Sequence, residues 1–129
     1  MTRDSARVLF LDDSEDLREL MAILLETTLG VSCMCFGSLR EIENHSEDVM
    51  LAKVAILDIN LGPDVPDGID AFNWLKDHGF QGRIMFLTGH ARTNPQVTMA
   101  GRSGAQILEK PLQTDKLISS VACALNGTL

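Results

Sequence analysis

Four short apolar runs in this chain each end on a polar side chain. The run in "RVLFLDDS" ends on Asp12 and Asp13, the run in "VAILDINLG" ends on Asp58, and the runs in "RIMFLTGH" and "QILEKPL" end on Thr88 and Lys110. Three of the runs are unbroken rather than alternating in polarity, which is typical of strands buried on both faces of a parallel sheet. The chain therefore predicts several buried strands that each deliver a polar group to one end.

Segments of helical periodicity alternate with the apolar runs. The first has a stripe of apolar residues from Leu17 to Leu25, with Ser14 as its expected N-cap and Gly30 at its end. Two further stripes and two weaker segments bring the predicted helices to five. We expect strands at Val8–Leu11, Val31–Phe36, Val54–Leu57, Ile84–Leu87 and Ala105–Leu108. We expect the other helices around Ile69–Leu75 and Leu117–Leu125, and more weakly at Leu39–Glu47 and Pro95–Arg102.

This alternation predicts one α/β domain: a doubly wound, five-stranded parallel sheet of order 2-1-3-4-5, with five helices on both faces. A chain of 129 residues can form such a domain without disulfides. The carboxyl ends of parallel strands lie at one edge, and ligands bind where the strand order reverses. We therefore expect Asp12 and Asp13 beside Asp58, with Thr88 and Lys110 on the neighbouring strands.

Three carboxylates in one place need a counter-charge, because like charges at close range repel. Lys110 supplies one positive charge, and a hard divalent cation would supply the rest. Mg²⁺ prefers oxygen ligands and is usually held by one or two carboxylates together with phosphate. A carboxylate beside Mg²⁺ and a lysine can attack phosphorus and form an aspartyl phosphate. The Thr88 hydroxyl could then bond to a phosphoryl oxygen.

The motifs "LDDS", "LDINL", "DGIDAF", "LTGHA" and "LEKPL" occur in this order along the chain. Together they resemble the receiver domain of two-component response regulators, from about Val8 to Leu125. The resemblance implies a single receiver domain over residues 1–129, with a core of about 7–126 and no output domain in this chain. It implies a flavodoxin-like phosphoacceptor fold in a cytoplasmic protein.

The resemblance also assigns roles to the residues that match the motifs. Asp58 would be the phosphoacceptor, Thr88 the switch hydroxyl and Lys110 the lysine that contacts the phosphoryl group. Asp12 and Asp13 would hold Mg²⁺ together with Asp58, and Mn²⁺ would be able to substitute for it. Asn60 would add its backbone carbonyl to the metal.

The implied protein is a regulatory protein rather than a metabolic enzyme, although it catalyses its own phosphorylation and dephosphorylation. Its expected phosphodonor is a histidine kinase or a histidine phosphotransfer protein, and its output is binding to a downstream protein target. The net charge of −7 argues against direct binding to nucleic acid or to an anionic membrane. No apolar run approaches the ~20 residues that a membrane span needs, and "MTRDSAR" has no apolar signal region.

The sequence departs from the family pattern in three places, one of which is His90, at a variable position two residues after Thr88 that tunes phosphoryl lifetime in the family. The segment from Asp58 to Gly68 is longer than usual. Ile107 stands where the family commonly has an aromatic residue, and a β-branched side chain has few rotamers to exchange. We therefore expect phosphorylation to shift the backbone around Pro95–Arg102, with Ile107 keeping one rotamer.

Three alternatives compete with this interpretation. A Mg²⁺-dependent phosphohydrolase with an aspartyl nucleophile usually carries Asp-x-Asp on its first strand, whereas Asp12 and Asp13 are adjacent here. A flavodoxin-like nucleotide binder would need a phosphate loop where this chain has "DDSED". A receiver-like module that binds partners without phosphorylation is the third, and the full set of site residues argues against it.

The three cysteines raise the question of a second metal site. Cys33 and Cys35 alternate on a predicted strand and share a face, which suggests zinc. Core packing explains them better, because the chain has no second cysteine pair and only three scattered histidines. Cys123 is expected on the core face of the last helix.

Overall fold

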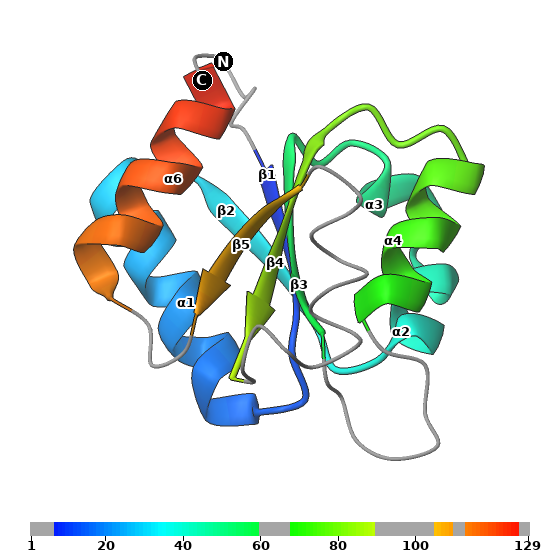
Figure 1. Cartoon of the computed structure of the whole chain (residues 1–129), viewed down its shortest axis with the longest axis horizontal. Coiled ribbons are helices and arrows are strands. Elements are labelled where there is room, and N and C mark those ends of the chain that lie inside the picture. Colours follow the sequence, from blue (N-terminus) through cyan, green and yellow to red (C-terminus); the bar gives the residue numbers. More distant parts are fainter. Residues whose placement is uncertain (1–6, 60–67, 90–104, 110–112, 127–129) are drawn as a thin grey trace.

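The computed structural model describes residues 7–59, 68–89, 105–109 and 113–126. Its five described strands form one parallel sheet in the order β2-β1-β3-β4-β5 (Figure 1). This confirms the predicted topology, including the reversal of strand order between β1 and β3. The strands are β1 Arg7–Leu11, β2 Ser32–Phe36, β3 Val54–Asp58, β4 Arg83–Thr88 and β5 Gln106–Glu109.

The described helices cover both faces of the sheet, as Figure 1 shows, with α1 and α6 on one face and α2, α3 and α4 on the other. Their bounds are α1 Glu15–Leu29, α2 Leu39–Asn44, α3 Ser46–Val49, α4 Gly68–Asp77 and α6 Thr114–Asn126. The predicted helix at Pro95–Arg102 lies outside the described residues. The start of β1 and the end of α6 lie at the end of the molecule opposite the carboxyl ends of the strands.

Helix α1 begins and ends where the sequence predicts. The Ser14 side chain accepts a hydrogen bond from the backbone N–H of Leu17 at 3.2 Å. At the other end Gly30 adopts the left-handed conformation, with φ of 68°, and donates its N–H to the carbonyl of Glu26. A side chain at this φ would be strained, so glycine is the residue that ends the helix here.

The helix predicted at Leu39–Glu47 begins at Leu39 as expected, but it ends at Asn44, and a second short helix follows after His45. The backbone of His45 leaves the helical region, with φ of −122° and ψ of 34°, and its N–H bonds to the carbonyl of Ile42. The ring of His45 contacts the ring of Phe36, with centroids 5.4 Å apart. This contact with β2 is tertiary, so helical periodicity could not predict the break.

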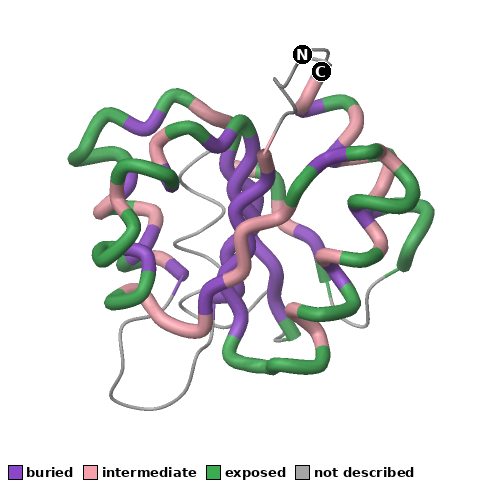
Figure 2. Tube along the Cα trace, turned by 180° about the vertical axis from the view of Figure 1, so that it is seen from behind, coloured by how far each residue is buried: buried purple, intermediate pink, exposed green. Residues whose placement is uncertain are grey.

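Two apolar layers enclose the sheet, and the strands contribute alternate residues to each. In β1, Val8 and Phe10 pack with α1 and α6, while Leu9 and Leu11 pack with the helices on the opposite face. All five residues of β3 are buried. Figure 2 shows this buried centre running along the strands. Burial on both faces explains why the apolar runs are unbroken.

Cys123 is exposed, and the expectation that it lies in the core is wrong. The buried stripe of α6 consists of Leu117, Val121 and Ala124. Cys123 follows Val121 by two positions, which places it on the opposite side of the helix. Within the described part of the chain, no helix is long and apolar enough to cross a membrane.

Candidate phosphorylation and metal site

The carboxyl ends of three neighbouring strands carry buried polar side chains. Asp12 follows β1, Asp58 ends β3 and Thr88 ends β4, and their exposed fractions are 0%, 3% and 1%. Within the described ranges these are the buried polar or charged residues. Polar side chains are costly to bury, so their concentration at one edge of the sheet indicates a functional site.

Three carboxylates meet at this edge. One oxygen from each of Asp12, Asp13 and Asp58 can be chosen so that the three lie within 4.8 Å of one another. Asp13 is exposed, whereas the other two are buried, so the cluster opens to solvent on one side. The donors are all hard oxygens, and such a set fits Mg²⁺ or a similar divalent cation.

The loop that carries Asp12 is held in place by several hydrogen bonds. The Asp12 carboxylate accepts the backbone N–H of Ser14 at 2.9 Å, and the Asp12 N–H donates to the carbonyl of Phe36 at 3.1 Å. The guanidinium of Arg18 donates to the Asp12 carbonyl at 2.7 Å. Because Ser14 is the N-cap of α1, helix capping does not account for the adjacent pair of aspartates.

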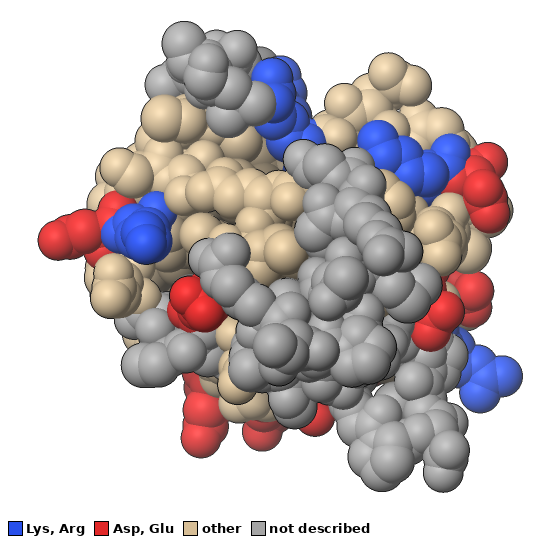
Figure 3. Space-filling model, in the orientation of Figure 1, with Lys and Arg blue, Asp and Glu red and all other residues tan. Residues whose placement is uncertain are grey.

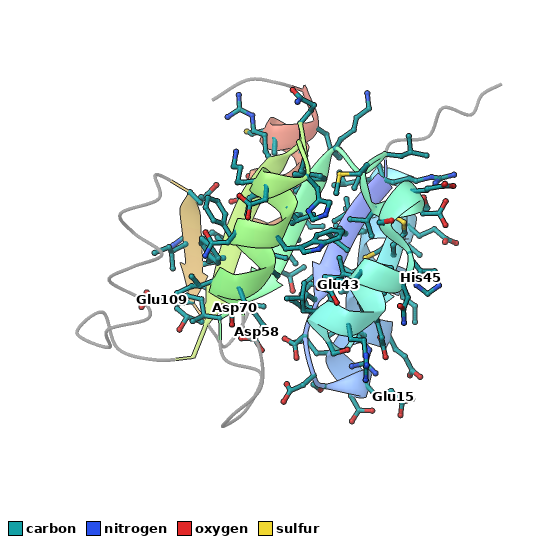
Figure 4. All side chains as sticks on the ribbon, turned by 90° about the vertical axis from the view of Figure 1, so that its right-hand side faces the viewer. Glu15, Glu43, His45, Asp58, Asp70 and Glu109 are labelled. Carbon is teal, nitrogen blue, oxygen red and sulfur yellow. The ribbon has the colours of Figure 1, made fainter. Side chains whose placement is uncertain are left out.

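Acidic side chains gather at this end of the molecule. On the face that Figure 3 shows, several described acidic residues lie at the lower end, and others lie at the left edge and at the upper right. In Figure 4, Asp70 and Glu109 are drawn at the same end as Asp58. Glu109 is the register partner of Thr88. Sequence reasoning did not include these two acids, because no motif marks them.

Ile59 and Gly68 are both held by backbone hydrogen bonds next to the end of β3. The N–H of Ile59 donates to the carbonyl of Leu87, and the N–H of Gly68 donates to the carbonyl of Ile59. A Cβ atom at Gly68 would overlap the carbonyl group of Asp58 and would lie 3.0 Å from the Cα of Ile59. The start of α4 can therefore approach the backbone of Asp58 only because residue 68 is glycine.

This contact predicts that Gly68→Ala lowers the free energy of unfolding by about 1–3 kcal/mol, because the methyl group meets backbone that must shift. Chemical denaturation measures the change. Gly37→Ala is the control, since its added Cβ would lie 3.1 Å from the guanidinium of Arg18, which is a side chain that can shift, rather than against backbone. Equal losses in the two variants would contradict the close packing of Gly68 on Asp58.

Lys110 and Asn60 lie outside the described residues, so their places at the site stay predictions from the sequence. The structure brings Asp12, Asp13 and Asp58 together, and it places Thr88 at the end of the next strand. This juxtaposition was expected from strand order alone. The described part of the site can therefore hold a divalent cation next to a buried carboxylate at a strand end.

Known proteins resemble the chain over most of its length. The sequence profile of the response regulator receiver domain matches residues 8–122. The response regulator protein TodT of Pseudomonas putida is 29% identical over 124 residues, which cover 95% of this chain and 52% of TodT. The chain thus spans about half the length of this relative.

Solved structures agree with this match. A response regulator receiver domain protein from Clostridium thermocellum is 25% identical, with a TM-score of 0.81 and coverage of 95% of each chain. A CheY-like receiver domain protein from Methanospirillum hungatei JF-1 has a TM-score of 0.83 over 96% of each chain. At 20% identity this second likeness concerns the fold alone. With the family profile covering most of its residues, this chain belongs to the response regulator receiver domain family.

Proposed function

We propose that the chain is a phosphorylation-switched receiver whose phosphoacceptor is Asp58. The observation that carries the proposal is the meeting of Asp58 with Asp12 and Asp13 at the strand ends, where the oxygens of all three approach within 4.8 Å. Asp58 is nearly buried on β3, so its carboxylate is held in one place by the strand. A fixed carboxylate beside a cation site is suited to attack phosphorus.

The reaction transfers a phosphoryl group from a phosphorylated histidine to an Asp58 oxygen. The new bond joins that oxygen to phosphorus, the bond from phosphorus to the imidazole nitrogen breaks, and the imidazole takes up a proton. Asp12, Asp13, Asp58 and the backbone carbonyl of Asn60 would hold Mg²⁺. Mg²⁺, or Mn²⁺ in its place, would neutralise charge on the transferring oxygens. Lys110 would contact the phosphoryl group.

The phosphodonor is a histidine kinase or a histidine phosphotransfer protein, and the phosphorylated chain acts by binding a downstream protein. Within this proposal the protein is regulatory, and it catalyses only its own phosphorylation and dephosphorylation. Residues 1–129 would form its single domain, with a core of about 7–126. The buried strands and the two apolar layers support a unit of this extent.

Wild-type protein with a small acyl phosphate and Mg²⁺ tests the function. Intact mass should rise by one phosphoryl group per chain, and the added mass should decay without further substrate. The phosphohydrolase alternative requires continuous release of phosphate from a phosphomonoester. Steady turnover of such a monoester, with no phosphorylated chain accumulating from the acyl phosphate, would favour that enzyme and contradict the receiver function.

Thr88→Ala should separate phosphorylation from its structural consequence. The Thr88 hydroxyl is buried at the end of β4, on the strand next to Asp58, and it would bond to a phosphoryl oxygen. The variant should accept the phosphoryl group on Asp58, yet the backbone amide shifts of residues 90–104 should change much less than in wild type. One hydroxyl bond contributes about 1 kcal/mol, so Lys110 and the metal should retain part of the response.

Methyl spectra of the same samples test the expected behaviour of Ile107. This residue is half-buried on β5 and packs against the core of the α4 face. Its side-chain methyl shifts should keep the pattern of one rotamer before and after phosphorylation, because a β-branched side chain has few alternatives.

For the Thr88→Ala test, equal amide changes in wild type and in the variant would show that the Thr88 hydroxyl is not the switch.

A further inference from the structure

Arg18 reaches from the first turn of α1 to the backbone of the acidic cluster. Its guanidinium Nη1 donates to the carbonyl of Asp12 at 2.7 Å, a short distance that is typical of a charged donor. The residue is half-buried, so water competes only in part for this donor. A guanidinium offers no lone pair to a cation. Arg18 therefore contacts a residue of the proposed metal site without being a ligand itself.

The carbonyl that Arg18 holds belongs to the peptide unit between the two adjacent aspartates. That unit is planar and contains the C=O of Asp12 and the N–H of Asp13. Rotation about the Cα–C bond of Asp12 would swing this carbonyl and change the direction of Asp13 relative to Asp12. Such a rotation would break the Arg18 bond, which therefore opposes it. The bond thus fixes how the two carboxylates lie relative to each other.

Two other hydrogen bonds hold Asp12. Its N–H donates to the carbonyl of Phe36 at 3.1 Å, and its carboxylate accepts the N–H of Ser14 at 2.9 Å. Both of these partners are backbone groups, whereas the carbonyl of Asp12 is held by the side chain of Arg18. A substitution at Arg18 can therefore remove one of the three bonds and leave the other two in place.

The structure leaves space for the guanidinium and fixes the backbone that carries it. Gly37 follows β2, and a Cβ atom at this position would lie 3.1 Å from Nη1 of Arg18. The carbonyl of Arg18 accepts a hydrogen bond from the thiol of Cys35 on β2 at 3.3 Å. Cys33 and Cys35 pack against the layer of α1 and α6, as expected for core cysteines. Arg18 is therefore held next to β2 at both its backbone and its side chain.

We propose that Arg18 is a positioning residue that arranges the Asp12 and Asp13 carboxylates for Mg²⁺. The inference rests on the proposed function, which assigns Mg²⁺ to this pair together with Asp58. The guanidinium has two opposing effects, because its bond orients the ligands while its positive charge repels the cation. Water on the exposed side of Asp13 screens the charge, whereas the short bond to the carbonyl is not weakened in this way. The bond should therefore prevail.

Titration with Mg²⁺ alone, without a phosphodonor, tests the proposal, and the backbone amide shifts of Asp13 and Ser14 report binding. Arg18→Met keeps an apolar stem but removes the donor and the charge. Its Mg²⁺ dissociation constant should rise at least about tenfold, as is typical when a residue that orients metal ligands is lost. Arg18→Lys keeps a charged donor of different shape and should fall between Arg18→Met and the wild type. Arg40→Met is the matched control, because it removes the same charge from an exposed position on α2.

The carbonyl carbon of Asp12 provides a second readout that a general loss of stability would not reproduce. Its chemical shift depends on the hydrogen bond that the carbonyl accepts, so it should move in Arg18→Met and move less in Arg18→Lys. A third readout needs no variant. The Nη nitrogens of Arg18 should give separate signals in the wild type, because the bond restricts rotation of the guanidinium.

Three results would overturn the positioning role: one averaged Nη signal in the wild type, an unchanged Mg²⁺ affinity in Arg18→Met, or a higher one. A higher affinity would show that the charge repels the cation more than the bond helps. Asp12→Asn separates this failure from failure of the proposed function. Loss of affinity in Asp12→Asn but not in Arg18→Met would remove only the role of Arg18, whereas full affinity in Asp12→Asn would contradict the metal site itself.

Discussion

An Asp58→Asn variant is expected to gain no phosphoryl group from an acyl phosphate under conditions that phosphorylate the wild type. Asparagine has nearly the shape of aspartate, so the buried position at the end of β3 should accept it without a large change in packing. The amide lacks the anionic oxygen that attacks phosphorus, and loss of a nucleophile lowers rates by at least about 10³-fold. Intact mass recorded over time measures the effect.

The same variant should be more stable than the wild type in the absence of metal. Neutralising one of three clustered carboxylates removes repulsion between like charges at close range. Asp48→Asn is the matched control, because Asp48 is an exposed aspartate on α3, away from the strand ends. The control should be phosphorylated like the wild type. Phosphorylation of Asp58→Asn at the wild-type yield would remove Asp58 from the proposed role.

Chelation of Mg²⁺ is expected to abolish phosphorylation while leaving the fold intact. The attack of Asp58 on phosphorus needs a cation, because without one the Asp12 and Asp13 carboxylates repel the incoming phosphoryl group. The fold does not need it, because two apolar layers that enclose the sheet provide the core. Asp12→Asn, which removes one buried ligand, should likewise reduce phosphorylation at a given Mg²⁺ concentration, and higher Mg²⁺ should partly restore it.

Thermal melting provides the second readout of metal removal. A cation that binds only the folded chain raises the free energy of unfolding by about 1.4 kcal/mol at ten times its dissociation constant, so chelation should lower the melting temperature only slightly. Circular dichroism should show no loss of helix or strand at 25 °C. Unfolding on chelation would identify a structural metal instead, and persistent phosphorylation without a divalent cation would exclude the proposed role of the acidic cluster.

The topology of the sheet was predictable because the sequence carries it in local patterns. Unbroken apolar runs indicate strands that are buried on both faces. The helical segments between these runs indicate that successive strands are joined by helical crossovers and lie parallel to one another. Once the strand order is known, strand ends meet at one edge, so residues far apart in sequence such as Asp12 and Asp58 were expected together. The ends of α1 were also predictable from local sequence, because Ser14 caps its start and Gly30 ends it, as expected.

The features that escaped prediction depend on contacts between elements. Nothing local shows that α4 approaches the backbone of Asp58 so closely that residue 68 must lack a side chain. The break at His45 accompanies a ring contact with Phe36 on β2. Cys123 is exposed because a different side of α6 faces the sheet. The small and apolar residues of this helix did not show in advance which side that would be. Such details are set by packing rather than by propensity.

Borohydride reduction of the phosphorylated chain tests the identity of the phosphoacceptor most directly. An aspartyl phosphate is an acyl phosphate, and borohydride reduces it to the alcohol, which converts that aspartate into homoserine and leaves free carboxylates unchanged. Peptide mass mapping then identifies the position. We predict homoserine at position 58 alone, and only in samples treated with both acyl phosphate and Mg²⁺. Homoserine at position 12 or 13, or none in a chain that carries the added phosphoryl mass, would contradict the assignment of Asp58.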